Sequence, residues 1–263
     1  MERGREAGDG MKIAIIGYGN MGKEVERQAK ANGIEVAAII DPEDSAAQYK
    51  SVGESSLRQA DVAIDFSSQK TELSNIEMVA GAGKDMVVGT TGWYNGLEEA
   101  GKIVRRCNTG LVYSPNFSIG ASLFMKIVEY ASRLMDKAPE YDPYIYEAHH
   151  SGKADSPSGT GRALADAVIR NVKRKKSAVF DRLDRRIKPD ELHVASLRAG
   201  SIPGIHTVGF DSASDTIELT HTARSRAGFA SGAIYAAKWI AGKKGIFSME
   251  DMVRDMMQGG EGK

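Results

Sequence analysis

The chain has 263 residues, 41% of them hydrophobic, which suits one large domain or two modest ones. Its 35 lysines and arginines balance 35 aspartates and glutamates, so the basic excess of a nucleic-acid-binding protein is absent. The single cysteine, Cys107, excludes an intramolecular disulfide, and no CxxC motif or histidine–cysteine cluster predicts a metal site.

Residues 1–10 are polar and lack the apolar stretch of a signal peptide, and no apolar run approaches the ~18 residues of a membrane span. We therefore expect a soluble, cytoplasmic protein that begins with a disordered extension of these ten residues. One dense basic run, Lys173-Arg174-Lys175-Lys176, is typical of a solvated helix end rather than of an anion site.

Short apolar runs rich in β-branched residues alternate with helix-compatible segments in the first half of the chain. The runs predict strands buried on both faces over residues 12–16, 35–40, 62–66, 86–88 and 111–113. The segments between them predict helices over residues 21–31, 69–82 and 96–106. This repeated alternation predicts an α/β fold with a parallel sheet.

The pattern changes after Pro115-Asn116. A helix is predicted over residues 121–137, then a strand over 143–148, a polar loop, and a helix from about 159 to 174. Strands follow over 193–198, 206–210 and 216–222, and two helices close the chain, the second opened by Ser248-Met249-Glu250-Asp251 at capping-box spacing. This order predicts a second, α+β domain with an open mixed sheet.

A glycine-rich segment, Gly17-Tyr18-Gly19-Asn20-Met21-Gly22, fits G-x-G-x-x-G between the first strand and the first helix. In this motif the glycines permit a tight turn, close approach of the backbone to a pyrophosphate, and close helix–strand packing, while the helix N-terminus faces the phosphates. Asp41 ends the second strand nineteen residues after Gly22, where a carboxylate accepts hydrogen bonds from the ribose hydroxyls of adenosine. We therefore predict a dinucleotide site rather than an ordinary α/β turn.

A polar element, E-A-H-H-S-G-K-A-D-S-P-S-G-T, spans residues 147–160. It places His149, His150 and Lys153 ahead of Ser158-Gly159-Thr160, which is typical of an N-cap and the first turn of a helix. The element supplies a group that titrates near neutral pH, a permanent cation, and backbone N–H donors for a carboxylate. Adjacent strand residues point in opposite directions, so the two histidines are expected to have different roles.

This element resembles the E-A-H-H-x-x-K-x-D-x-P-S-G-T signature of the dihydrodipicolinate reductases, the 4-hydroxy-tetrahydrodipicolinate reductases of lysine biosynthesis. The resemblance runs from Lys12 to about Met252. It includes the family's loops near the cofactor, which here read Asp65-Phe66-Ser67-Ser68, Gly89-Thr90-Thr91-Gly92 and Ser114-Pro115-Asn116-Phe117.

The resemblance implies a Rossmann-like dinucleotide-binding domain over residues 11–117, completed by 227–263. It also implies an α+β domain over 118–226 that binds substrate and joins a homotetramer through its mixed sheet. The implied cofactor is NADH or NADPH, without a metal, held by the loops at 17–22, 89–91 and 114–117. The implied reaction is the reduction of a cyclic dicarboxylate imine.

The same resemblance assigns roles within the polar element. His149 is the implied general acid–base residue and Lys153 its partner, while His150, Gly159 and Thr160 bind a substrate carboxylate. The segments 198–207 and 220–226 match further family elements, and we expect their histidines, His206 and His221, to be structural. The glycine loop departs from the family's common G-x-x-G-x-M-G by being one residue shorter, which leaves its hold on the pyrophosphate open.

The residues after the second strand bear on the choice of cofactor. Asp41 is followed by Pro42, where dual-specificity relatives often carry an arginine, and Glu43 and Asp44 add negative charge. These residues favour NADH over NADPH because they would repel a 2′-phosphate.

Two alternatives stay open at this point. Another two-domain dehydrogenase, such as an aspartate or homoserine dehydrogenase, would share the first half of the chain but lack the H-H-x-x-K…S-G-T cluster. A non-catalytic dinucleotide-sensing protein would keep the glycine loop and have no use for His149 or Lys153.

Overall fold

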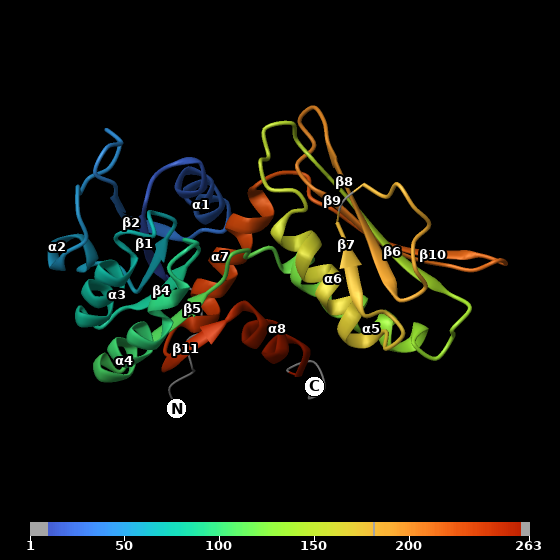
Figure 1. Cartoon of the computed structure of the whole chain (residues 1–263). Coiled ribbons are helices and arrows are strands. Elements are labelled where there is room, and N and C mark those ends of the chain that lie inside the picture. Colours follow the sequence, from blue (N-terminus) through green and yellow to red (C-terminus); the bar gives the residue numbers. More distant parts are fainter. Residues whose placement is uncertain (1–9, 181, 259–263) are drawn as a thin grey trace. The chain divides into compact units, whose positions relative to one another are not determined.

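A computed structural model describes residues 10–180 and 182–258, so all but the last residue of the extension predicted over 1–10 lies outside the described residues. The chain forms two compact units (Figure 1). The first runs to Ile119 and resumes at Arg226, and the second is Gly120–Ser225. Within the described ranges, no helix is long and apolar enough to cross a membrane.

The first unit is built on a six-stranded parallel sheet with the order β11-β5-β4-β3-β1-β2. Its strands are β1 (Lys12–Ile16), β2 (Glu35–Ile40), β3 (Val62–Asp65), β4 (Asp85–Val88), β5 (Gly110–Tyr113) and β11 (Gly245–Ser248). Its helices are α1 (Asn20–Ala31), α2 (Glu54–Leu57), α3 (Glu72–Gly81), the 3-10 turn η1 (Tyr94–Gly96), α4 (Leu97–Cys107), α7 (Ala227–Ile240) and α8 (Met249–Gln258). The strand order reverses between β1 and β3, which is where such sheets bind ligands.

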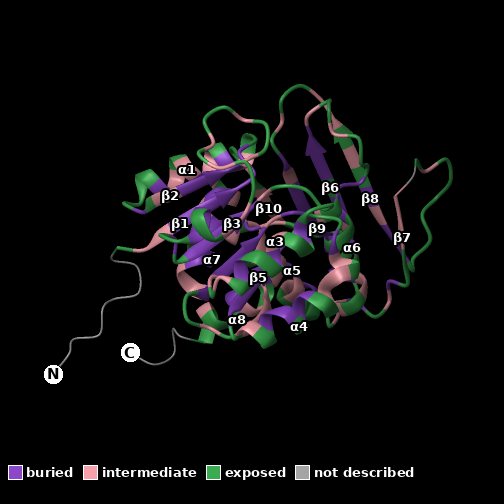
Figure 2. Ribbon diagram, turned by 90° about the vertical axis from the view of Figure 1, so that its left-hand side faces the viewer, coloured by how far each residue is buried: buried purple, intermediate pink, exposed green. Residues whose placement is uncertain are grey.

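Both faces of this sheet are covered, which explains why its strands are continuous apolar runs. Ile13 and Ile15 of β1 pack into a layer with α1 and α7, while Ala14 and Ile16 pack into the layer with α3 and α4. Figure 2 shows β1, β3 and β5 of this sheet as mainly buried. Each fully buried isoleucine contributes about 1.5–3 kcal/mol relative to an exposed one, so the two layers hold the loops at the strand ends in place.

The second unit is built on a five-stranded mixed sheet with the order β10-β9-β6-β8-β7. Its elements are α5 (Ile119–Met135), β6 (Asp142–His149), α6 (Gly159–Asn171), β7 (Ser177–Val179), β8 (Glu191–Arg198), β9 (Ile205–Asp211) and β10 (Thr216–Thr222). Strand β6 runs parallel to β8 and antiparallel to β9. Phe124 of α5 and Leu164 of α6 pack against Ile145 and Val208 on one face of the sheet.

The predicted fold class, a Rossmann-like parallel-sheet domain and an α+β domain with an open mixed sheet, is confirmed. The sequence pattern does not predict three short elements, α2, β7 and β11. Strands β7 and β11 lie at the edges of their sheets and have no buried residue, so they lack the apolar run that predicts strands as short as β3, β4 and β5.

The basic run after α6 differs from its prediction. Helix α6 ends at Asn171, and Lys175 is only 1% exposed. Its Nζ donates to the carbonyl oxygens of Pro189 (3.0 Å) and Glu191 (2.8 Å) and pairs with the Asp142 carboxylate at 2.6 Å. Three oxygens therefore compensate the buried ammonium, which ties the segment before β8 to β6. The prediction of a solvated helix end is wrong for this lysine.

Candidate active site

The loops predicted to hold the cofactor all lie at one edge of the parallel sheet. Gly17 follows β1, Asp41 follows β2, Phe66 follows β3, Gly89 follows β4 and Ser114 follows β5. Because these strands are parallel, their carboxyl ends meet at the same edge. The fold thus brings together segments that are up to about a hundred residues apart in the sequence.

The glycine loop has two positions that only glycine fits. Gly17 has φ +84°, and a Cβ there would lie 2.7 Å from the Phe66 carbonyl oxygen. A Cβ on Gly22 would lie 2.1 Å from the Gly17 carbonyl oxygen. Gly19, the N-cap of the twelve-residue helix α1, has open space beside it. These features leave a backbone cradle at a helix N-terminus, an arrangement that is typical of pyrophosphate sites.

Asp41 organises the loops around this cradle. Its carboxylate accepts backbone hydrogen bonds from Tyr18 (2.7 Å), Glu43 (2.8 Å) and Asp44 (2.9 Å). Burial alone would raise the pKa of Asp41, but these N–H donors outweigh it and lower the pKa below its ordinary value. The neighbouring cation Lys23 pairs with Asp44 at 2.8 Å. A cavity of about 340 Å³ is lined by Tyr18, Gly19, Asn20, Lys23, Asp41, Glu43 and Asp44.

The loop after β4 rests on a buried carboxyl group. The Thr90 hydroxyl donates to Oδ1 of Asp65 at 3.2 Å, and the Gly89 N–H donates to the Asp65 carbonyl oxygen at 2.8 Å. Gly89 packs on the Phe66 ring so closely that a Cβ would overlap it. Thr91 is exposed at the tip of the loop. Contacts with Asp65 and Phe66 therefore fix the inner side of the loop, while Thr91 on its outer side is accessible to a ligand.

The segment after β5 is equally constrained. The Ser114 hydroxyl donates to the Asn116 carbonyl oxygen (2.7 Å) and accepts from the Asn116 N–H (3.0 Å). Phe117 is buried, and its carbonyl oxygen lies so close to α7 that a Cβ on Gly232 would approach it to 1.6 Å. Pro115 and Asn116 are thus presented on a fixed turn.

In the second unit, Glu147 is the centre of the polar network. Its Oε1 accepts from the Ser158 N–H (3.0 Å) and from Nη2 of Arg198 (2.8 Å), and its Oε2 accepts from the Ser158 hydroxyl. Burial would raise the pKa of Glu147, but the hydrogen bonds from Ser158 and Arg198 outweigh it and lower the pKa to about 2. Glu147 is therefore a fixed negative charge at the end of β6.

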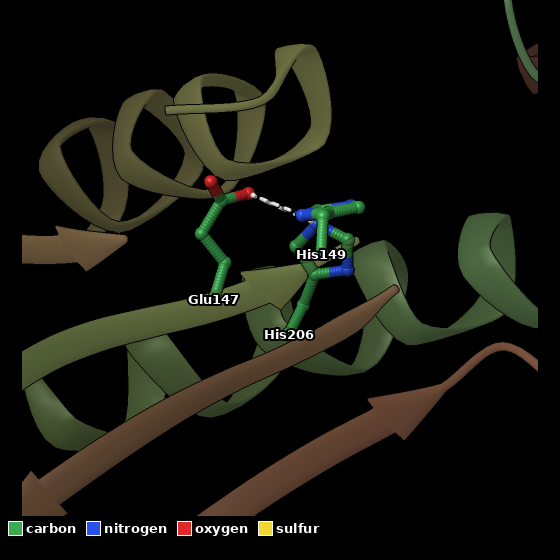
Figure 3. Close-up of side chains that lie close together, drawn as sticks. All are labelled: Glu147, His149 and His206. Atoms are coloured by element: carbon green, nitrogen blue, oxygen red, sulfur yellow. Dashed lines mark ion pairs between the residues drawn. The ribbon is translucent and has the colours of Figure 1, made fainter. Parts of the chain in front are cut away.

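His149 and His206 face this carboxylate (Figure 3). Glu147 and His149 are two residues apart on β6, so their side chains lie on the same face of the sheet. His206 comes from the neighbouring strand β9. Oε2 of Glu147 lies 3.5 Å from Nδ1 of His149 and 3.5 Å from Nε2 of His206, and the two ring centroids are 5.0 Å apart. Burial is the main cause that lowers the pKa of His149, and it lowers that of His206 to about 4.

Lys153 lies in the loop between β6 and α6 and does not contact His149 directly through an ion pair or hydrogen bond. Its Nζ pairs with the Asp155 carboxylate at 2.7 Å. The Lys153 hydrogen bond is the main cause that lowers the pKa of Asp155, and the Gly159 N–H also contributes. Asp155 thus places a carboxylate against Lys153, the predicted partner of His149, and beside the helix start that is predicted to bind a substrate carboxylate.

The start of α6 is capped as predicted. The Ser158 hydroxyl accepts from the Gly161 N–H at 3.0 Å, and Gly159 and Thr160 are the first residues of the helix. His150 follows the end of β6 and is half-buried, with Nδ1 beside Gly152, so it does not join His149 and His206. The fold therefore separates the two adjacent histidines, as strand alternation predicts.

Sequence reasoning missed Glu147, Arg198 and Gly204 as members of this site and predicted Ser158 only as the N-cap of α6. Glu147, Ser158 and Arg198 hold the carboxylate network, and a Cβ on Gly204 would lie 3.2 Å from Nε2 of His149. Each of these residues lies in one of the segments that match the family's motifs, and this match is the signal in the sequence that could have identified it. The pairing of β6 with β8 and β9, which joins them, is not visible in the sequence.

A glycine cradle at a helix N-terminus with an aspartate after the second strand is typical of nicotinamide dinucleotide domains, and the buried cluster of Glu147, His149 and His206 lies in a separate unit with a different sheet. This combination defines the class of two-domain nicotinamide-dependent oxidoreductases. Residues 11–117 match the family "Dihydrodipicolinate reductase, N-terminus" and residues 120–253 match "Dihydrodipicolinate reductase, C-terminus". The chain belongs to the dihydrodipicolinate reductase family, and the resemblance drawn from the sequence is confirmed.

Individual relatives agree with this assignment. A 4-hydroxy-tetrahydrodipicolinate reductase from Christiangramia forsetii is 34% identical over 94% of this chain and 100% of its own length. One from Archaeoglobus fulgidus is 38% identical over 92% of this chain and 100% of its own. A solved structure of a dipicolinate-bound dihydrodipicolinate reductase from Paenisporosarcina sp. TG-14 has the same fold, with a TM-score of 0.76 and 22% identity over 92% of this chain and 99% of that one.

Proposed function

We propose that this chain reduces 4-hydroxy-tetrahydrodipicolinate to tetrahydrodipicolinate, with loss of water, in the diaminopimelate route of lysine biosynthesis. The observation that carries the proposal is the full-length match to reductases of this name, at 34% and 38% identity. The alternatives, another dehydrogenase or a dinucleotide sensor, do not account for a match across both halves of the chain. As a biosynthetic oxidoreductase, the protein is expected in the cytoplasm.

The buried cluster supports His149 as the general acid–base residue. NADH or NADPH, when bound, supplies the hydride. Glu147 faces Nδ1 of His149, which favours a proton there and leaves Nε2 for exchange with the substrate. Reduction of a conjugated imine at ring C4 moves electrons toward the ring nitrogen, where a positioned donor completes the protonation. The Lys153 ammonium would offset the developing negative charge.

The start of α6 supports a carboxylate site. The amides of Gly159 and Thr160 lie in the first turn of a thirteen-residue helix, where N–H groups have no partner within the helix. His150 lies on the same connection and would add a donor. Asp155 now contributes its own carboxylate to Lys153 and Gly159. A substrate carboxylate would take the place of Asp155, which is consistent with the dicarboxylate bound by the solved relative.

The loops of the first unit support NADH as the preferred cofactor. Asp41 accepts three backbone hydrogen bonds, and its fourth acceptor position remains for a ribose hydroxyl. Lys23, the cation that lines this cavity, is paired with Asp44, and Lys50 Nζ donates to the Asp44 carbonyl oxygen at 3.0 Å. Glu43 and Asp44 line the same cavity as Asp41, so a phosphate there would meet three carboxylates.

The test is the ratio of kcat/KM for NADH and NADPH. One like-charge contact in a partly wet site is worth on the order of 1–2 kcal/mol, so NADH should be preferred by roughly tenfold. Asp41→Ala should narrow this ratio, and Asp41→Asn, which keeps an acceptor for the loop amides, should narrow it with less loss of stability. Equal or better use of NADPH by the unmodified chain would refute the preference and leave the reductase assignment intact.

The mixed sheet supports a homotetramer. Helices α5 and α6 cover one of its faces, whereas Tyr146 of β6 and Leu197 of β8 point to the other and are 40% and 57% exposed. Exposed apolar side chains on an open sheet are typical of a subunit interface.

A further inference from the structure

Glu147, His149 and His206 bring three metal-ligating atoms together, although the sequence predicts no metal site and the proposed reaction uses none. These atoms lie within 4.8 Å of one another, and all three side chains are buried. Figure 3 shows the two imidazole rings gathered at the same carboxylate oxygen. The donors come from two paired strands, so the cluster is created by the fold.

The two separations that involve Glu147 fit a four-coordinate ion. With bonds of about 2.0–2.2 Å, two ligand atoms at a tetrahedral angle lie roughly 3.3–3.6 Å apart. Oε2 of Glu147 is 3.5 Å from Nδ1 of His149 and 3.5 Å from Nε2 of His206. One carboxylate oxygen and two imidazole nitrogens form a donor set that Zn²⁺ and related ions accept, with a fourth position left open.

The unpaired nitrogen of His149 points independently to a ligand. His149 is 7% exposed, and its Nδ1 has no hydrogen-bond partner in the part of the chain that the structure describes. A buried polar atom without a partner is rare in native proteins, and a bound ion or water is a usual explanation. The hydrogen bonds that Arg198 and Ser158 make to Oε1 fix Glu147 with its Oε2 toward this nitrogen.

The charges around the cluster permit a cation. Arg198 is bound to Glu147 at 2.8 Å, and Lys153 is neutralised by Asp155 at 2.7 Å. The Ser158 hydroxyl contacts Oε2 of Glu147 and lies 3.2 Å from Nε2 of His206. An ion must therefore displace this hydroxyl or take it as the fourth ligand.

We propose that Glu147, His149 and His206 bind one divalent transition-metal ion of the zinc class, and that the bound ion arrests the reductase by withdrawing His149 from proton transfer. The binding stands on the geometry of the cluster. The arrest rests on the proposed function of His149.

Cobalt provides a readout that does not depend on activity. Untagged, metal-free protein is titrated with Co²⁺ while the visible absorption of the four-coordinate ion is followed, and Zn²⁺ is then added to displace it. We expect one saturable ion per chain. His206→Gln and His149→Gln should each weaken binding by at least roughly tenfold. His193→Gln, which changes a histidine on the adjacent strand β8 outside the cluster, should bind like the unmodified chain.

The outcomes separate the two parts of the proposal. Absence of a cobalt band up to millimolar concentration, or equal affinities of the His206 and His193 variants with far-ultraviolet circular dichroism unchanged, would overturn the site. Zn²⁺ should inhibit the reductase over the same concentration range in which it displaces Co²⁺. Binding without inhibition would overturn the arrest and, with it, the acid–base role of His149, while the metal site would stand.

Discussion

Gly204 has no side chain, and this sets how closely the connection between β8 and β9 approaches His149. Its φ of +152° is one that residues with a Cβ rarely adopt, and a Cβ would lie 3.2 Å from Nε2 of His149. That nitrogen is the one turned away from Glu147 and proposed to exchange a proton with the substrate. The packing at one glycine thus bears directly on the chemistry of the neighbouring histidine.

Gly204→Ala should lower kcat by roughly tenfold, because small displacements of a catalytic group are costly. Gly200→Ala is the matched control, since Gly200 also has a positive φ (+48°) but open space where a Cβ would go. Backbone strain should lower the stability of both variants. Only Gly204→Ala should also lower kcat, because only its new Cβ would contact His149. Similar turnover in the two variants, measured under saturating substrate, would contradict this view of Gly204.

Single helices and strands differ in how well the sequence predicts them. The strands β1, β3, β4 and β5 are almost wholly buried, whereas β2 is buried only in its second half. The capping box of α8 is present, with Ser248 N donating to Asp251 (2.8 Å) and Asp251 N donating to Ser248 (3.2 Å). These features depend on residues close together in the sequence, so the sequence predicts them. The contacts of Glu147 with Arg198 and His206 require strand pairing across about fifty residues, so no local pattern predicts them.

Helix α3 contains a second feature without a local signal, the buried Glu72. It is fully buried and neither of its carboxyl oxygens has a well-formed hydrogen bond among the described residues. Nearby Asp65 accepts hydrogen bonds from Ser67 N, Asn75 and Thr90, which favour its charged form, although burial outweighs them and raises its pKa. Burial and then the Asp65 charge raise the pKa of Glu72 to about 9.

The raised pKa predicts a loss of stability with rising pH. The folded state holds the Glu72 proton more tightly than the unfolded state does. The resulting stabilisation of the fold is fully present below pH 4.5, the ordinary pKa of glutamate, and is lost as the pH rises toward 9. The free energy of unfolding is measured by urea denaturation at several pH values. Between pH 5 and pH 8 the free energy of unfolding of Glu72→Gln should rise, relative to that of the unmodified chain, by on the order of 1–3 kcal/mol. Glu77→Gln, an exposed position on the same helix, should show no such trend. A pH-independent difference between the Glu72 variant and the unmodified chain would contradict a buried neutral carboxyl group.

At the scale of the whole molecule, the sequence predicts two domains and the structure has two units, but assembly depends on surfaces that only the fold defines. Tyr146 and Leu197 lie on neighbouring strands of the mixed sheet, opposite the face that α5 and α6 cover. Alternation along β6 and β8 places them there, yet the sequence does not reveal that, among the described residues of the second unit, the helices cover only the other face.

The proposed tetramer predicts that a charge on this face disrupts assembly. Leu197→Glu should shift the particle from four chains to a smaller species in light scattering at micromolar concentration, because it would bury a carboxylate in an apolar interface. Met78→Glu, an exposed apolar position on α3 of the first unit, should leave the particle unchanged. A monomeric unmodified chain would refute the assembly itself.

The central claim is that His149, oriented by Glu147, transfers the proton with Lys153 as its partner. The most direct measurement is kcat for His149→Gln and Lys153→Ala with enzymatically generated 4-hydroxy-tetrahydrodipicolinate and NADH, with His193→Gln as the control. We expect kcat to fall by roughly 10²–10⁴-fold in the first two variants, the usual contribution of a positioned proton donor, while NADH binding and unfolding stay close to those of the control. Turnover near that of the unmodified chain in both variants would contradict the claim.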